Sequence, residues 1–287
     1  MHSKHPITRT ILITTGLLAL SLGLGGCAAG QADEPGIGST QTVPIDGMLM
    51  VYVPAGEFVM GSEYSTEPQA AKTERGRFVV ENEDPPHTVY LDAFWIDQTE
   101  VTQEMYAACV AAGACREPSC GNVGENYPVV CVSRKDAMNY CTWAGRQLPS
   151  EAQWEKAARG TDGRIYPWGD EPSSCEYAVM NDGTDAGFCE QGNKVWPVGS
   201  KTAGASPYGA LDMAGNAWEW VADLYAVDYY ADSPSENPTG PETGQSGVVR
   251  GGGEFDYYWY DVRTTARGHS RVTWRDFNLG FRCAAMP

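Results

Sequence analysis

The sequence predicts an α+β fold in a single loop-rich domain. The domain begins with short stretches in which apolar and polar residues alternate, as is typical of strands. Two segments with helical spacing of apolar residues follow. After the second helix, glycine, proline and aromatic residues interrupt every segment, and the sequence shows no internal repeat of solenoid length. A length of 287 residues with 42% hydrophobic content is sufficient for a substantial core.

The expected elements can be placed in chain order. Two short strands, a strand that enters a helix, and two further helices are predicted over residues 48–62, 87–102, 133–145 and 149–160. Side-chain oxygens that can accept from the first free N–H groups of a helix mark the start of each one. The N-cap candidates are Thr99 or Thr102, Ser133 and Ser150.

The first residues predict export. A basic start is followed by an apolar run of fourteen residues, Ile11 to Leu24, which is too short for a mature membrane span but suits a signal peptide. The run enters "LGGC", which resembles the lipobox of bacterial lipoproteins, although an ordinary secretory signal with a chance cysteine is the alternative. The prediction is a signal peptide over 1–26, a lipidated Cys27 and flexible tether over 27–45, and a folded domain over 46–287.

The predicted location is the bacterial cell envelope. Ala28, and not an acidic residue, follows Cys27, which in Gram-negative lipoproteins implies sorting to the outer membrane. The expected contact with the membrane is through the lipid alone. The formal charge of −17 repels phosphate backbones, so no nucleic-acid partner is expected.

The remaining cysteines predict disulfides. Without Cys27, eight of the nine cysteines are left, an even number that fits an oxidising compartment, although eight permit 105 pairings. Zinc is not expected, because the cluster between residues 109 and 131 contains no CxxC pair and lies near no histidine. From their positions, the expected pairs are Cys109 with Cys115, Cys120 with Cys131, and Cys175 with Cys189.

Eight stretches, taken in order, are similar to one known family. They are "VYVPAGEFVMGS", "VYLDAFWIDQTEVTQEMYAACV", "YPVVCVSRKDAMNYCTWAGRQLPSEAQWEKAARG", "YPWGD", "PVGS", "SPYGALDMAGNAWEW", "VVRGGG" and "NLGFRCA". The chain resembles the formylglycine-generating enzymes, or sulfatase-modifying-factor domains, over about residues 47–286. The resemblance implies a variant of the C-type-lectin fold.

The resemblance also shows where this chain departs from the enzymes. In the family, two cysteines hold copper(I), and oxygen then converts a sulfatase cysteine to formylglycine. The matching positions are Asp256 and Asp261 here, and Gly253 stands where the enzymes have a serine. Copper(I) prefers thiolate and carboxylate suits harder ions, so copper is not expected. Use of the two aspartates as an acid and base pair requires the stretch between them to bend, because residues five apart on a strand face opposite sides.

The family disulfides are half present. The resemblance implies a bridge between Cys141 and Cys283, which both occur here. A second family bridge would join positions occupied by Ala158 and Ala266, so both of its partners are missing together.

A structural calcium site is a further implication of the resemblance. Its donors map onto Asp212, Gly215, Ala217 and Glu219, and oxygen donors from a glycine-bearing loop suit calcium. The alternative is a plain turn that leads into a strand with Trp218 and Trp220 in the core. A second family calcium site near residue 179 matches only loosely and is left open.

The aromatic stretch after the glycines predicts a ligand groove. Aromatic rings supply contact area at small entropic cost, so such a groove could hold a peptide or a glycan, although alternate rings facing the core is the competing interpretation. The groove candidates are Tyr257, Tyr258, Trp259, Tyr260, Arg263 and Trp274.

These observations favour a pseudoenzyme. The leading hypothesis is a binding or envelope-assembly module that uses the family's substrate groove for an extracytoplasmic protein, peptide or glycan. The alternative is an oxidoreductase of the same family with altered chemistry that does not need the cysteine pair. Standard formylglycine generation is the least favoured interpretation, because the cysteine pair is replaced.

Overall fold

The computed structural model describes Met1 and residues 35–63, 82–121, 123–181, 189, 195–253 and 261–287. Residues 35–287 form one compact unit. The predicted signal peptide and Cys27 lie outside the described residues. Within the part of the chain that the structure describes, no helix is long and apolar enough to cross a membrane.

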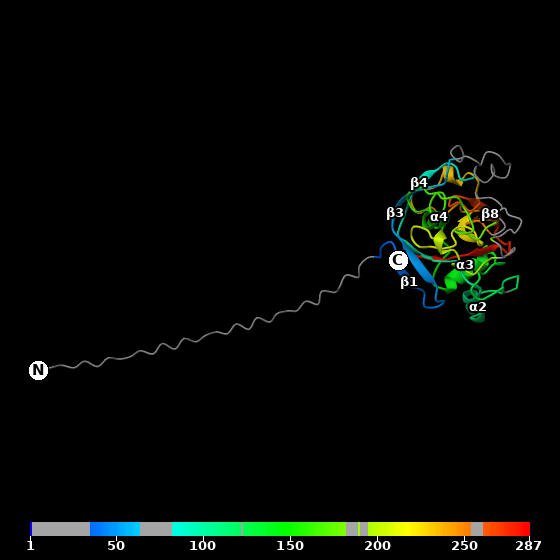
Figure 1. Cartoon of the computed structure of the whole chain (residues 1–287), viewed down its shortest axis with the longest axis horizontal. Helices are drawn as coiled ribbons and strands as arrows, with labels where there is room; N and C mark the ends of the chain where they lie inside the picture. Colours follow the sequence, from blue (N-terminus) through cyan, green and yellow to red (C-terminus); the bar gives the residue numbers. More distant parts are fainter. Residues whose placement is uncertain (2–34, 64–81, 122, 182–188, 190–194, 254–260) are drawn as a thin grey trace. The chain divides into compact units, whose positions relative to one another are not determined.

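In the part of the chain that the structure describes, ten strands form three sheets, whose arrangement can be followed in Figure 1. The first sheet has the order β1-β2-β5-β10, the second pairs β3 with β4, and the third has the order β8-β7-β6-β9. All pairings are antiparallel except that of β6 with β9. The strands are β1 (Thr40–Thr42), β2 (Leu49–Val53), β3 (Gly56–Met60), β4 (His87–Leu91), β5 (Phe94–Asp97), β6 (Trp218–Leu224), β7 (Ser246–Arg250), β8 (Arg267–Arg271), β9 (Leu279–Phe281) and β10 (Ala284–Ala285).

Three α-helices begin at the predicted caps. They are α2 (Gln103–Ala111), α3 (Arg134–Trp143) and α4 (Glu151–Arg159), and two 3₁₀ turns cover Thr202–Gly204 and Tyr229–Ala231. The hydroxyl groups of Thr102, Ser133 and Ser150 each accept a hydrogen bond from the third backbone N–H of their helix. The α+β prediction is confirmed, and Thr102, the second of the two candidates, caps α2.

Two predicted boundaries are corrected. Residues 87–102 contain two strands and not one. The extended segment is interrupted between β4 and β5, and the two strands join different sheets. The tether predicted over 27–45 extends too far, since Thr40–Thr42 pair with β2 as β1. Three exposed polar residues carry no apolar pattern, so β1 has no signal in the sequence.

The helix α4 lies near the middle of the domain, and α2 and α3 lie together at one side (Figure 1). Eight of the nine residues of α4 are buried, and it contacts β3, β4, β6 and β7. Its Trp154 is fully buried and donates from Nε1 to Glu219 Oε2 at 2.9 Å. A helix buried on all sides must satisfy its polar residues internally, which explains the ionic contacts that surround it.

All eight cysteines that the structure describes are in disulfides. The pairs are Cys109–Cys115, Cys120–Cys131, Cys141–Cys283 and Cys175–Cys189, as predicted. The longest of the four joins α3 to the C-terminal strands across 142 residues. It therefore ties the middle of the chain to its end.

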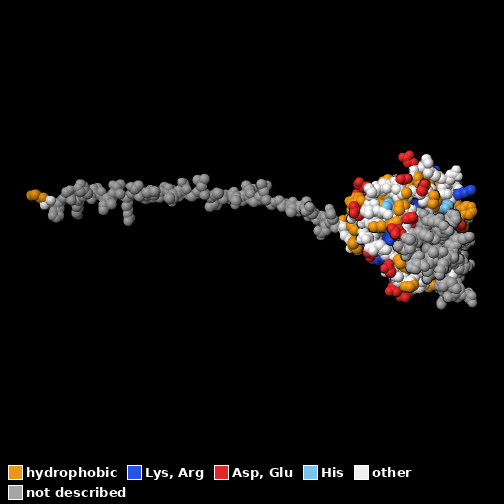
Figure 2. Space-filling view, turned by 90° about the horizontal axis from the view of Figure 1, so that it is seen from above, with side chains coloured by type: hydrophobic (Ala, Val, Ile, Leu, Met, Phe, Trp, Pro, Cys, Tyr) orange, Lys and Arg blue, Asp and Glu red, His pale blue; other side chains and the backbone are white. Residues whose placement is uncertain are grey.

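Acidic side chains are spread over the surface. Figure 2 shows red carboxylate groups at several places on the described part of the face in view and few blue cationic groups. Large apolar side chains are exposed singly, and Trp274 and Phe277 are the two aromatic ones among them, each 54% exposed.

Stability at the start of α4 is expected to depend on pH. Asp223, 2% exposed, accepts from the Glu151 N–H at 2.8 Å, and burial together with the charge of Glu151 raises the pKa of Asp223 from 3.8 to about 7. The folded protein therefore holds a proton between about pH 4 and pH 7 that the unfolded chain releases, so this carboxyl makes stability fall as pH rises through that window.

The substitution Asp223→Asn tests this dependence. The variant is expected to gain free energy of unfolding relative to the parent at pH 8 and to gain less at pH 5, because the amide has no charge to bury. Urea unfolding at the two pH values measures the difference. An equal difference at pH 5 and pH 8 would contradict the raised pKa.

Candidate functional site

A groove of about 230 Å³ lies on the sheet β8-β7-β6-β9. Its sides are mostly aromatic and apolar, with a few hydrogen-bonding groups between them. Such a lining is typical of sites that bind by ring contact and use polar groups for orientation. The lining residues are Trp218, Val249, Gly268, His269, Ser270, Trp274, Asp276, Asn278 and Leu279.

Two tryptophans shape the groove. Trp218, at the start of β6, packs its ring over Gly268 of β8, where a Cβ atom would come within 2.9 Å of the ring. Trp274 follows β8, and the orientation of its ring is fixed by a hydrogen bond from its Nε1 to Asp276 Oδ2 at 3.0 Å. A ring fixed before binding loses little entropy when a ligand arrives.

Gly253, which stands where the family has a serine, borders the groove. A Cβ atom on Gly253 would lie 3.0 Å from the Trp218 ring and 3.3 Å from Asn278 Nδ2. Gly252, at φ +73, leaves room for the Asp261 carbonyl, which would be 2.7 Å from a Cβ at that position. Gly252 and Asp261 are therefore close neighbours, and Gly253 contacts the groove residues Trp218 and Asn278.

The predicted site residues Asp256, Tyr257, Tyr258, Trp259 and Tyr260 lie outside the described residues. Asp261 is half-buried in a turn. The roles of these side chains stay predictions.

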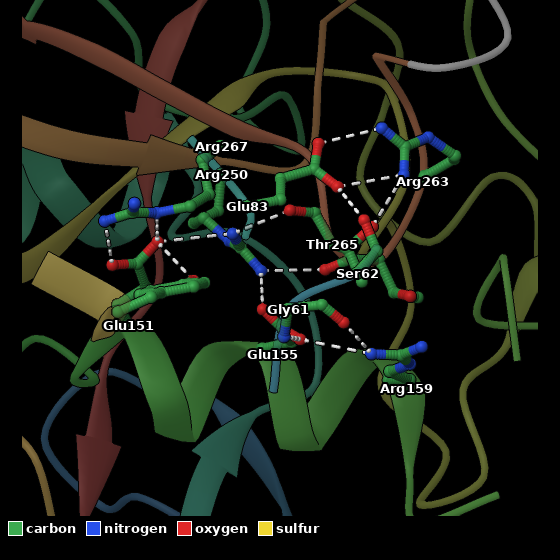
Figure 3. A network of polar contacts seen from close by, with 12 residues as sticks. Gly61, Ser62, Glu83, Glu151, Glu155, Arg159, Arg250, Arg263, Thr265 and Arg267 are labelled. Carbon is green, nitrogen blue, oxygen red and sulfur yellow. Dashed lines mark hydrogen bonds and ion pairs between the residues drawn. The ribbon is translucent and has the colours of Figure 1, made fainter. Parts of the chain in front are cut away.

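A buried ionic network holds both ends of residues 250–267 (Figure 3). Arg250, the last residue of β7, donates to Glu151 at 3.2 Å and to Glu155 at 2.6 Å. Arg267, the first residue of β8, forms a two-pronged pair with Glu151 at 2.6 and 2.9 Å. Since both carboxylates are on α4, the central helix fixes the entry to and the exit from the stretch that carries the family's cysteine positions.

Arg263 is part of this network and does not line the groove. Its side chain is 1% exposed and donates to both oxygens of Glu83, at 2.9 and 2.8 Å, and to Thr265 Oγ1. The prediction of Arg263 as a ligand contact is therefore wrong. Arg263 was placed in the groove because it follows the aromatic stretch, but its partner Glu83 is 180 residues away in sequence and left no local signal.

His269 is the titratable base of the groove. It is on β8, and its ring stacks on Tyr225 with centroids 4.1 Å apart. Partial burial and the nearby Arg267 lower the pKa of His269, so the imidazole is neutral at pH 7. A neutral imidazole beside two indoles can orient a polar group of a ligand by hydrogen bonding.

The predicted calcium turn lies in the interior. Its donor candidates Asp212, Gly215, Ala217 and Glu219 are all buried. Gly215, at φ +78, is required there, because a Cβ would lie 2.3 Å from the Val179 carbonyl oxygen. Glu219 accepts from Arg282 at 2.7 Å on each oxygen and from Trp154 as well, so its carboxylate is committed to the guanidinium group.

A third buried carboxyl group, that of Glu100, lies near Asp212 and Glu219. Glu100 is 0% exposed; its Oε1 accepts from Asn216 at 2.9 Å, and its Oε2 has no hydrogen-bond partner in the described part of the chain. Burial and the charges of Asp212 and Glu219 raise the pKa of Glu100 well above its usual value. The charge of Arg282 acts on all three carboxyl groups, and backbone carbonyls are donors of the kind calcium accepts.

The side chains alone do not complete a metal site. Among the described residues, no group of three or more His, Cys, Asp and Glu is arranged to hold a metal ion. We propose calcium as the cation of this turn, bound through Asp212 and carbonyl oxygens.

Calcium binding is testable by melting temperature. We expect calcium to raise the melting temperature and a chelator to lower it, with stabilisation of about 2.7 kcal/mol when free calcium is about 100 times its Kd. Asp212→Asn is expected to remove the effect, and the exposed Asp228→Asn is the matched control. Identical melting curves with calcium and with chelator would contradict calcium binding.

The described residues do not fit copper(I). Each of their eight cysteines is in a disulfide, so they offer no thiolate, and Asp261 stands at one of the two family copper positions. The prediction that copper is not a cofactor rests on this donor set.

Some groove residues were missed in the sequence. The sequence placed Trp218 in the core together with Trp220 only as the alternative to a calcium turn; of the two, Trp220 is fully buried and Trp218 is partly exposed. Strand alternation places Trp218 and Trp220 on the same face of β6, and a residue at the end of a strand is more exposed than one in its middle. The position of Trp218 at the start of the strand could therefore have predicted that it is only partly buried. His269 and Asn278 carry no signal of their own, because the contacts that place them are long-range.

The similarity of this chain to known proteins extends over nearly the whole domain. Residues 38–287 match the family described as sulfatase-modifying factor enzyme 1-like domain. The formylglycine-generating enzyme of Streptomyces coelicolor is 34% identical over 82% of this chain and 88% of its own length. The inactive C-alpha-formylglycine-generating enzyme 2 of Bos taurus is 35% identical over 55% of this chain and 50% of its own length.

Solved structures show the same fold. The structure of PvdO from Pseudomonas aeruginosa superposes with a TM-score of 0.72 and 25% identity, covering 88% of this chain and 100% of that one. Treponema denticola variable protein 1 has a TM-score of 0.65 at 23% identity, covering 87% of this chain and 99% of that one. The fold expected from the sequence is thereby confirmed.

Proposed function

We propose that this chain, which belongs to the sulfatase-modifying factor enzyme 1-like domain family, is a binding module of the cell envelope and not a formylglycine-generating oxidase. Its ligand is a peptide or glycan segment of an extracytoplasmic partner, held in the groove between Trp218 and Trp274. The observation that carries the proposal is the combination of this groove with described cysteines that are all oxidised to disulfides.

The shape and lining of the groove support binding. Two indole rings, one of them held by Asp276, present flat apolar area, and His269 and Asn278 offer hydrogen bonds beside it. Such an arrangement suits a side chain or a sugar face. The inactive relative in Bos taurus supports the idea that members of the family occur without the oxidation.

The absence of oxidation can be tested directly. The mature protein is incubated with copper(I), oxygen and a sulfatase-type CxPxR peptide, and mass spectrometry follows conversion of the cysteine to the aldehyde. The Streptomyces coelicolor enzyme serves as the positive control. We expect no aldehyde from this protein, and copper-dependent turnover would overturn the proposal.

Binding through the groove needs a matched pair of variants. Trp274 lines the groove and Phe277 does not, although both are 54% exposed. Trp274→Ala is expected to weaken capture of the envelope partner by about 2 kcal/mol, or roughly 30-fold, as truncation of a central aromatic contact does. Phe277→Ala is expected to leave it unchanged, and an equal effect of both variants would contradict the groove.

A further inference from the structure

A second cavity, of about 650 Å³, lies on the other side of the turn that carries Trp274. Thr273 and Arg275 line this second cavity, whereas Trp274 and Asp276 line the groove. The two sites therefore share a wall but no lining residue. The second cavity, named the basic pocket below, is lined by Arg116, Ser133, Arg134, Lys135, Asp136, Met138, Asn139, Leu224, Gly244, Val272, Thr273 and Arg275.

The charge of the basic pocket is opposite to that of the chain. Four of the twenty Lys and Arg residues line it, against a single carboxylate, in a chain whose formal charge is −17. The four come from three segments: the loop after α2, the first turn of α3 and the turn after β8. Positive charge gathered in a cavity of an acidic protein raises the local concentration of anions there.

The one carboxylate of the pocket is already committed. Asp136 accepts from the Ser133 N–H at 2.9 Å as part of the α3 capping box, and it pairs with Arg275 at 2.6 Å. Arg134 donates to the backbone carbonyls of Val221 and Ala222 and has no carboxylate partner among the described residues. The pocket therefore keeps an excess of positive charge.

Two of the cations are available to a ligand. Arg116 and Lys135 are exposed, and neither forms an ion pair with any residue that the structure describes. The lining also includes three apolar side chains, namely Met138, which is 42% exposed, Leu224 and Val272. The lining thus offers both ionic and apolar contacts.

We propose that the basic pocket binds an acidic peptide segment that carries apolar residues between its carboxylates. Arg116 and Lys135 come from different elements, which distributes the charge over the pocket and suits a chain with several carboxylates better than one compact phosphate. The apolar lining accounts for the rest of the contact. This site is independent of the ligand in the Trp218–Trp274 groove.

The probe is a fluorescein-labelled peptide of alternating glutamate and leucine, and its glutamine–leucine counterpart is the neutral control. Fluorescence anisotropy with the full mature chain measures Kd. The double variant Arg116→Glu/Lys135→Glu reverses two exposed charges, and Lys201→Glu, a single charge reversal outside the pocket, is the control for a change of charge elsewhere on the protein. Thermal melting checks that each variant is folded.

We expect the acidic peptide to bind with a Kd below about 1 mM and the double variant to weaken it at least roughly tenfold. Lys201→Glu and the groove variant Trp274→Ala are expected to change the Kd by less than about twofold, which separates this site from the proposed function. The proposal is overturned if the acidic peptide does not bind, if the neutral peptide binds equally, if the double variant binds normally, or if an equal concentration of inorganic phosphate displaces the peptide.

Discussion

Glu151→Gln is expected to lower the free energy of unfolding by about 3–5 kcal/mol, the cost of breaking a buried ion pair from one side. The Glu151 carboxylate lies among Arg250, Arg267 and the Tyr230 hydroxyl, which all donate to it. Burial works against its charge, but Arg267 and Arg250 hold the pKa of Glu151 below its usual value. An amide in its place leaves two buried guanidinium groups without full charge compensation.

Urea unfolding with disulfides intact measures the effect, and Glu57→Gln on the exposed face of β3 is the matched control. The control is expected to change stability by less than about 0.5 kcal/mol. A loss of less than about 1 kcal/mol for Glu151→Gln would contradict a central role of the network. Because the network holds both ends of residues 250–267, we also expect proteolysis between them to become faster in the variant.

Removal of the Cys141–Cys283 bridge is expected to have the second large effect. The two cysteines are 142 residues apart, and a crosslink over a long loop restricts the unfolded chain most, which predicts a loss of about 4–5 kcal/mol for the double alanine variant. Both cysteines are 0% exposed, so the smaller alanines also leave buried space unfilled.

The Cys109–Cys115 bridge is the internal comparison. It closes a loop with a separation of only 6 residues, so its removal is expected to cost about 2 kcal/mol. Chemical unfolding of the two double variants gives the order of the losses. If the short bridge proves to be worth as much as the long one, chain restriction is not the main contribution.

The sequence predicted local structure well where a short-range signal exists. Ser133 and Ser150 cap their helices because an N-cap and its partner lie three residues apart, within one turn. The pairs Cys109–Cys115, Cys120–Cys131 and Cys175–Cys189 are close in sequence, and the bridge to Cys283 came from the family resemblance.

Long-range contacts explain the errors. Arg263 was expected in the groove because its neighbours are aromatic, but Glu83, 180 residues earlier, draws it into the interior. Trp218 was not predicted as a groove residue, but it borders the groove because β7 ends at Arg250, the partner of Glu219. No pattern in a single sequence reports which distant carboxylate meets which guanidinium group.

The basic pocket was also not found in the sequence. Arg134 and Lys135 are adjacent, but Arg116 and Arg275 join them only when the loop after α2 and the turn after β8 come together. A chain with a charge of −17 gives no compositional hint of a cationic cavity. Net charge describes the surface as a whole and hides local exceptions.

The strand β1 has a mechanical consequence. It is a three-residue strand at one edge of its sheet, paired only with β2, and all three residues are exposed. A force applied to the chain before β1 therefore meets a short ladder that opens one pair at a time. Each residue released adds at most about 3.6 Å of length. The segment before β2 is thus expected to lengthen under load as β1 separates from β2, and to shorten again when β1 pairs with β2, while the rest of the domain stays folded.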